Sequence, residues 1–343
     1  MIKQIFRNHP KTIAAVLAVL IYALIPFFIK SPYYLDLFIM TLINAVLGMA
    51  FLITLRTGLI NMGLAAFWGV GAYTSAVLAT KFNLSFWICL PASALTTALV
   101  ALVIGYFIIG SGSTGFNFVI LSSVIGMLFV VTFGNIRYLN GYNGITNIPF
   151  PDSIAIPFFP PIDFSSKAAL FYLALFFFML ILLIQMALYS SKIGRAWSAI
   201  GLNANLAQSI GINIFRYKLL AFVVASGLAG LIGSFYAHYG SFVIPYTYAM
   251  FTNIYIQIYA ILGGIGYAIL GPIVGSAVMV FFPELFRITR EWTTILTGGL
   301  LIMLVLFLPK GLLSLVDRRT VVMNNVVNVY SSILQLRNKE SNK

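Results

Sequence analysis

Long apolar runs dominate the chain, and polar residues gather in the short segments between them. A helix that crosses a membrane needs about 20 mostly apolar residues. Windows of that kind, bounded by charged residues, Pro or Gly-rich breaks, recur along the sequence. Their approximate ranges are 12 to 29, 33 to 55, 62 to 80, 86 to 109, 116 to 135, 168 to 190, 218 to 237, 247 to 263, 267 to 283 and 292 to 308.

The unbroken apolar runs predict helices rather than the strands of a barrel, which would alternate apolar and polar residues. We therefore expect an all-α, polytopic integral membrane protein with about ten transmembrane helices, some of them broken or re-entrant at Gly-rich segments. One transmembrane domain is expected over residues 1–319, with an extracytoplasmic loop at 136–167 and a cytoplasmic loop at 191–217. No function is assigned to the tail at 320–343, which is expected in the cytoplasm.

The positions of Lys and Arg predict the orientation, because these residues accumulate on the cytoplasmic side. If the first span starts inside, the inner segments hold fourteen basic residues against two acidic ones, and the outer segments hold six against five. Both termini are then cytoplasmic. The net charge of +13 lies at span ends and in the tail, which disfavours a nucleic-acid binder. No small-x-small cleavage pattern follows the first apolar run, so an uncleaved span is expected.

The composition disfavours an enzyme, since 61% of the residues are hydrophobic and only 8% are charged. Cys89 is the single cysteine, so we expect no metal site, and His238 with its aromatic neighbours is interpreted as part of an interfacial belt. No ionisable side chain is expected deep in a span, which disfavours coupling to an ion gradient. A phosphate-binding Gly-x-x-x-x-Gly-Lys-Ser/Thr loop is missing from the sequence, so any nucleotide-driven step requires a partner.

Two Gly-rich stretches, at 56–73 and 262–275, interrupt the apolar pattern. Glycine in a membrane helix permits either close packing or a break that exposes backbone polar groups, and these two interpretations of the first stretch are equally weighted. In the second, a tight turn at 263–266 and helix contact through Gly271 and Gly275 are expected. The candidate substrate path consists of Asn44, Asn61, Gly63, Gly69, Gly71, Asn253 and Gln257, although hydrogen bonds between helices explain such polar residues equally well.

The cytoplasmic loop at 191–217 has apolar residues at helical spacing, which predicts a short amphipathic helix parallel to the membrane. Those apolar residues are Ala196, Trp197, Ile200, Ala204 and Ala207. Gly194, Gly201 and Gly211 are expected to delimit or bend the helix. Such a helix either anchors the loop or docks a cytoplasmic motor. The outer loop contains Pro149, Pro151, Pro157, Pro160 and Pro161, which indicates an ordered, exposed segment.

An ordered set of motifs from about Asn44 to Asp317 resembles the LivM-type permease subunit of branched-chain amino acid ABC importers. The motifs are Gly63-Leu-Ala-Ala-Phe-x-Gly69-x-Gly71-Ala-Tyr73, Asn117 to Leu121, Gly141 to Pro149, Gly194-Arg-Ala-Trp197, Gly211-Ile-Asn213, Tyr217-Lys-Leu219, Ala221-Phe222, Ala229-Gly230, Leu262 to Gly266 and Pro309-Lys-Gly-Leu312. Where the family often carries an acidic cluster, this chain reads Gly201-Leu-Asn-Ala-Asn205, which is closer to sugar-importer relatives.

The resemblance implies a non-catalytic subunit in the inner membrane that binds no cofactor itself. It implies a second, LivH-like permease subunit, two cytoplasmic ATPase subunits that bind ATP and Mg, and an extracytoplasmic substrate-binding protein. The residues implied to couple the chain to the ATPase are Gly194, Arg195, Ala196, Ala199, Asn203, Ala207 and Gly211. Import of urea, short amides or a sugar is the alternative within transport. An energy-independent channel or scaffold is the alternative of another class.

Overall fold

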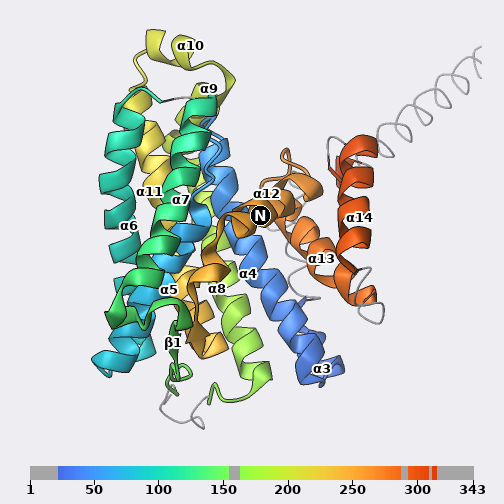
Figure 1. The fold of residues 1–343 in the computed structure, drawn as a ribbon. Helices are drawn as coiled ribbons and strands as arrows, with labels where there is room; N and C mark the ends of the chain where they lie inside the picture. Colours follow the sequence, from blue (N-terminus) through green and yellow to red (C-terminus); the bar gives the residue numbers. More distant parts are fainter. Residues whose placement is uncertain (1–21, 114, 154–162, 287–292, 309–310, 315–343) are drawn as a thin grey trace, which may run out of the picture.

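A computed structural model describes residues 22–113, 115–153, 163–286, 293–308 and 311–314. Helices make up most of this part of the chain (Figure 1). The helices are α3 (Ile25–Phe28), α4 (Pro32–Leu55), α5 (Leu64–Lys81), α6 (Phe86–Gly110), α7 (Gly115–Asn135), α8 (Lys167–Ser190), α9 (Lys192–Leu202), α10 (Ala204–Ser209), α11 (Ile214–Gly240), α12 (Met250–Gly263), α13 (Leu270–Leu285) and α14 (Thr293–Phe307).

Short elements connect the helices at the end of the bundle opposite α9. Three 3₁₀ turns are described: η1 (Arg137–Leu139), η2 (Gly141–Asn143) and η3 (Pro245–Tyr248). Strand β1 (Ile145–Thr146) pairs antiparallel with β2 (Phe242–Val243), with Ile145 opposite Val243. This pairing joins the α7–α8 loop to the segment that follows α11.

The all-α prediction is confirmed, and helices occupy the last nine expected spans. The first expected span lies mostly outside the described residues, as does the tail. In the described part, α4, α6, α7, α8 and α11 are long and apolar enough to cross a membrane. By contrast, the 14 residues of α12 and the 16 of α13 extend only about 21 and 24 Å, which is short of a hydrocarbon core of about 30 Å.

The centre of the bundle is formed by α4 and α11. Helix α4 packs against α8, α11, α12 and α13, while α11 also packs against α5 and α6. Most of the side chains of α4 are buried, whereas α6 and α7 expose long apolar side chains such as Leu99, Phe107 and Leu128. Because lipid solvates a membrane protein, these two helices are expected to face the bilayer.

Glycines allow the backbones of neighbouring helices to touch, as the close-packing interpretation predicts. A Cβ placed on Gly71 of α5 would collide with the backbone of Gly230 in α11. The same holds for Gly275 of α13 against the carbonyl oxygen of Tyr259 in α12, and a Cβ on Gly271 would also collide with the Gly264 carbonyl oxygen. The tight turn expected at 263–266 separates α12 from α13.

The structure corrects the interpretation of His238 as an interfacial residue. Its side chain is fully buried inside α11, where Nδ1 donates to the Pro149 carbonyl oxygen at 2.7 Å and Nε2 lies 3.0 Å from Ser75 Oγ. Ser75 Oγ lies 2.8 Å from Ser234 Oγ as well. The hydrophobic neighbours of His238 therefore form a core around a small polar network that holds α5, α11 and the α7–α8 loop together.

Candidate functional site

The start of α5 is capped by a side chain from a distant helix. The chain leaves α4 at Leu55, runs through a non-helical segment and enters α5 at Leu64. Gly63 precedes α5 and has no side chain that could cap it. Instead, Asn253 of α12 accepts a hydrogen bond from the Ala65 N–H through Oδ1 at 2.7 Å. A first-turn N–H group that the helix itself cannot satisfy is thereby paired.

Further amide groups gather at the same place, which we call the amide cluster: Asn61, Met62, Gly63, Ala65, Asn253 and Gln257. Asn61 Oδ1 accepts from the Gly63 N–H at 2.9 Å. Nε2 of Gln257 contacts the Met62 sulfur. The polar groups of the amide cluster thus come from two elements: the segment that leads into α5, and α12.

Contacts with α7 place the amide cluster inside the membrane-spanning region. The Met62 N–H donates to Ser122 Oγ at 3.1 Å, and a Cβ on Gly126 would lie 3.5 Å from Gly63 Cα and 3.8 Å from Asn253 Nδ2. Ser122 and Gly126 are about 10 and 16 Å along α7 from its end near α9, and the whole helix is about 31 Å long. The cluster therefore lies between one third and one half of the way through the bundle.

Two hydrogen-bond donors in the amide cluster have no acceptor. Nδ2 of Asn61 and Nδ2 of Asn253 are buried without a partner among the described residues, and each side chain is 1% exposed. A buried amide donor without an acceptor costs on the order of 1–3 kcal/mol. Together with the positive end of the α5 dipole, such donors favour a ligand that carries acceptor oxygens, such as a carboxylate.

Aromatic side chains cover the amide cluster on the side facing away from α9, farther along α5. Trp68 contacts Tyr248 of η3 edge to face at 4.9 Å between ring centroids, and Tyr73 stacks on Phe133 at 4.4 Å. Gly69 leaves room for the Tyr248 ring. Trp68 Nε1, Tyr73 Oη and Tyr248 Oη are also buried without partners in the described part of the chain.

At the α9 end of the bundle, one arginine joins α9 to the entry of α5. Nε of Arg56 donates to Ser198 Oγ of α9 at 2.7 Å, and its guanidinium carbon lies 4.1 Å from the centroid of the Tyr189 ring. Gly201 of α9 rests on the Arg56 carbonyl oxygen. Arg56 begins the same segment that ends in the amide cluster, so a rigid displacement of α9 would reach that cluster through few residues.

Residues 12–306 match the protein family described as the branched-chain amino acid transport system permease component. The chain belongs to this family. LivM, the high-affinity branched-chain amino acid transport system permease protein of Salmonella typhimurium, is 28% identical over 316 residues, which are 87% of this chain and 74% of LivM. LivM of Escherichia coli K12 is 28% identical over 305 residues, 83% of this chain and 71% of LivM.

Other permeases show weaker likeness. LivH of Escherichia coli K12 is 28% identical over 138 residues, covering 40% of this chain and 44% of LivH. A putative glucose ABC transporter permease of Haloferax volcanii, TsgC13, is 24% identical over 191 residues, 54% of this chain and 56% of TsgC13. No solved structure matches the chain.

The prediction of a single amphipathic helix in the 191–217 loop is wrong, because this loop forms two helices, α9 and α10. The chain breaks at Asn203, whose extended backbone ends α9 and whose Oδ1 caps α10 by accepting from the Leu206 N–H at 3.1 Å. Gly194 and Gly201 do not delimit a helix but lie within α9, where they allow close contact with neighbouring backbone. Gly211 ends the loop with φ of +87°, a conformation that favours glycine.

The seven residues implied to couple the permease to an ATPase fall into two groups. Gly194, Ala196 and Ala207 are buried, and Ala199 is half-buried. Arg195, Asn203 and Gly211 are exposed, and Arg195 donates to the Ser190 carbonyl oxygen at 3.0 Å. Sequence reasoning missed three strongly exposed apolar side chains beside them: Leu202 (88% exposed), Leu206 (64%) and Ile210 (70%). Their spacing of four residues was the available signal.

Four of the seven predicted path residues meet in the amide cluster: Asn61, Gly63, Asn253 and Gln257. Gly69 and Gly71 instead serve as packing positions against Tyr248 and Gly230. Asn44 is half-buried in α4 and has no hydrogen bond to the cluster. Sequence reasoning did not find Ser122 and Gly126, although their i, i+4 spacing of small residues in α7 is typical of a helix contact.

Proposed function

We propose that this chain is a permease subunit of an ABC importer for Leu, Ile and Val, and that it forms the translocation path together with a second, LivH-like permease subunit. The proposal is supported by membership of the permease family and by the length of chain aligned with LivM. Two cytoplasmic ATPase subunits bind ATP and Mg and hydrolyse the ATP. An extracytoplasmic binding protein delivers the substrate.

The observation that carries the substrate proposal is the amide cluster with its unpaired donors, Asn61 Nδ2 and Asn253 Nδ2. These donors and the start of α5 would receive the carboxylate of an amino acid without any charged side chain. The apolar surroundings suit a branched aliphatic side chain. The likeness to TsgC13 supports a sugar as the second candidate, since carboxamides also bind hydroxyl groups.

Uptake by the reconstituted importer tests this function. Proteoliposomes that contain this chain, the second permease subunit and the ATPases, supplied with the binding protein and with ATP inside, are expected to accumulate labelled leucine. Unlabelled isoleucine and valine should compete with it, whereas glucose and urea in equal excess should not. ATP-independent equilibration of leucine would indicate a channel, and competition by glucose would indicate the sugar alternative.

The proposed orientation places α9, α10 and both termini in the cytoplasm, as the distribution of Lys and Arg indicates. In that orientation the exposed Leu202, Leu206 and Ile210 are available to the ATPase. An apolar, protruding helix end is typical of a segment that docks into a partner. Movement of α9 would then reach the amide cluster through Arg56, which α9 holds by a side-chain hydrogen bond and by its Gly201 contact.

Replacing Arg56 by Met is expected to uncouple transport from ATP hydrolysis. Met keeps most of the aliphatic volume but removes both the bond to Ser198 and the contact with the Tyr189 ring. These contacts are worth about 1–3 kcal/mol, so ATP-driven leucine uptake should fall roughly tenfold while ATP hydrolysis persists. The matched control is Lys192→Met, at an exposed position at the start of α9. It should leave the ratio of leucine uptake to ATP hydrolysis unchanged. An unchanged ratio in Arg56→Met would contradict this coupling route.

A further inference from the structure

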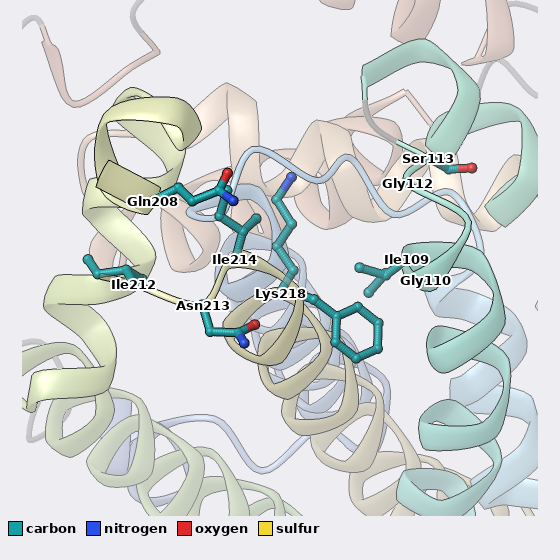
Figure 2. A pocket seen from close by; sticks show the side chains of 10 residues that line it. Ile109, Gly110, Gly112, Ser113, Gln208, Ile212, Asn213, Ile214 and Lys218 are labelled. Carbon is teal, nitrogen blue, oxygen red and sulfur yellow. The ribbon is translucent and has the colours of Figure 1, made fainter. Parts of the chain in front are cut away.

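A pocket of about 430 Å³ opens near the α9 end of the bundle, away from the amide cluster. It lies between the end of α6 with the turn that follows it and the connection from α10 to α11 (Figure 2). The residues that line it are Ile109, Gly110, Gly112, Ser113, Gln208, Ile212, Asn213, Ile214, Phe215 and Lys218. Neither the proposed substrate path nor the Arg56 contacts include any of these residues.

Lys218 is the only charged residue among the described residues that line the pocket. Its side chain is 6% exposed and rises from the first turns of α11 into the space between α6 and the end of α10. No acidic side chain among the described residues forms an ion pair with it. Burying an ammonium group without a negative partner is costly, so the site favours an occupant that brings a negative charge.

The beginning of α11 adds further positive potential. Asn213 caps this 27-residue helix by accepting from the Arg216 N–H at 3.0 Å. The N–H groups of Ile214 and Phe215 have no acceptor among the residues that the structure describes. Helix N-termini attract anions through such N–H groups and through the helix dipole. The buried ammonium and the helix start therefore point to the same ligand chemistry.

The surroundings of the pocket indicate a lipid as the source of the anion. Along α6, an exposed apolar stripe formed by Leu95, Leu99, Val103 and Tyr106 leads to Gly110 at the pocket, with a spacing of three or four residues throughout. Tyr106 contacts Phe215 of the pocket wall edge to face at 5.6 Å between ring centroids. The pocket and the stripe thus provide adjacent places for a charged headgroup and an acyl chain.

We propose that this pocket binds the phosphate group of an anionic phospholipid, with the phosphate beside Lys218 and an acyl chain along the exposed stripe of α6. The lipid would fill the space between α6 and the α10–α11 connection. It would thereby support the segment from which α10 projects. The interaction couples the lipid composition of the inner leaflet to the stability of this end of the permease.

Thermal unfolding of the purified full-length chain tests the proposal. In detergent with added phosphatidylglycerol, the apparent Tm of the unmodified chain should exceed that with phosphatidylcholine by about 3 °C. Lys218→Met should remove this difference, and Lys218→Arg, which keeps the charge, should largely preserve it. The matched control Lys192→Met also removes one positive charge at the α9 end, but from an exposed position, and should preserve the full difference.

Native mass spectrometry of the same samples supplies a second readout, which counts the lipids bound to each variant rather than measuring its stability. The unmodified chain should retain one more phosphatidylglycerol molecule than Lys218→Met does. Equal retention by both, or an equal Tm difference, would overturn the proposal. It would also be overturned if inorganic phosphate alone reproduced the Tm rise in phosphatidylcholine, which would indicate a free anion rather than a lipid as the occupant.

Discussion

A single methyl group added at Gly71 should nearly abolish uptake. The Cβ of Gly71→Ala would collide with the backbone of Gly230, where α5 crosses α11, and no rotamer change can relieve contact between two backbones. Overpacking of this kind costs about 3 kcal/mol. The two helices must separate, which also displaces the start of α5 and with it the amide cluster. Thermal inactivation and leucine uptake of the variant measure both consequences.

The matched control for Gly71→Ala is Gly227→Ala in α11. Its added Cβ would lie 3.5 Å from Ala98 Cβ and 3.6 Å from the Ala94 carbonyl oxygen, which is ordinary van der Waals contact. This variant should retain uptake and a nearly unchanged temperature of inactivation. Equal behaviour of the two variants would mean that the α5–α11 crossing is not as close as the structure has it.

Replacing Asn253 by Leu should reduce leucine uptake by more than tenfold while the protein still inserts and folds. The substitution removes the acceptor of the Ala65 N–H and the unpaired Nδ2 donor of the amide cluster together. An unpaired N–H group inside a membrane protein costs about 1–3 kcal/mol, and the loss of a ligand contact adds to it. The dependence of uptake rate on leucine concentration measures the effect.

Two further variants separate the role of Asn253 from a general loss of polarity. When ionised, Asn253→Asp keeps an acceptor for the Ala65 N–H, loses the donor and adds a negative charge that repels a substrate carboxylate, so it should bind substrate poorly. Asn135→Leu makes the same replacement at the exposed end of α7, where the amide bonds only to its own helix, and should have little effect. If Asn253→Asp transported leucine normally, the unpaired donor would have no part in substrate binding.

Much of the fold was predictable, because the length and apolarity of a segment decide whether it crosses a bilayer. The ranges expected for the spans at 33 to 55, 86 to 109 and 168 to 190 differ from α4, α6 and α8 by one residue at most at either end. Charged residues and Pro at the ends of these long helices indicate in the sequence where each helix begins and ends. The short α12 was harder, because its partner η3 contributes irregular structure to the same expected span.

The amide cluster was predictable only as a set of candidates. Asn61, Asn253 and Gln257 stood out as polar residues in apolar surroundings, but nothing local indicates that residues nearly two hundred positions apart share one helix start. Gly69 and Gly71 were path candidates because glycine permits a break in a membrane helix, and the structure uses them for packing. His238 was misjudged because its aromatic neighbours are typical both of an interface and of a core.

The sequence alone establishes that this chain is a polytopic helical membrane protein of the permease family, because continuous apolar runs and ordered motifs are local properties of the chain. Which polar groups contact one another depends on the three-dimensional packing of the helices. The capping of α5 by Asn253, the hydrogen bond from Arg56 to α9 and the burial of Lys218 each depend on contacts between elements distant in sequence. Because those contacts decide which groups are hydrogen-bonded and buried, the pattern of any single segment cannot predict them.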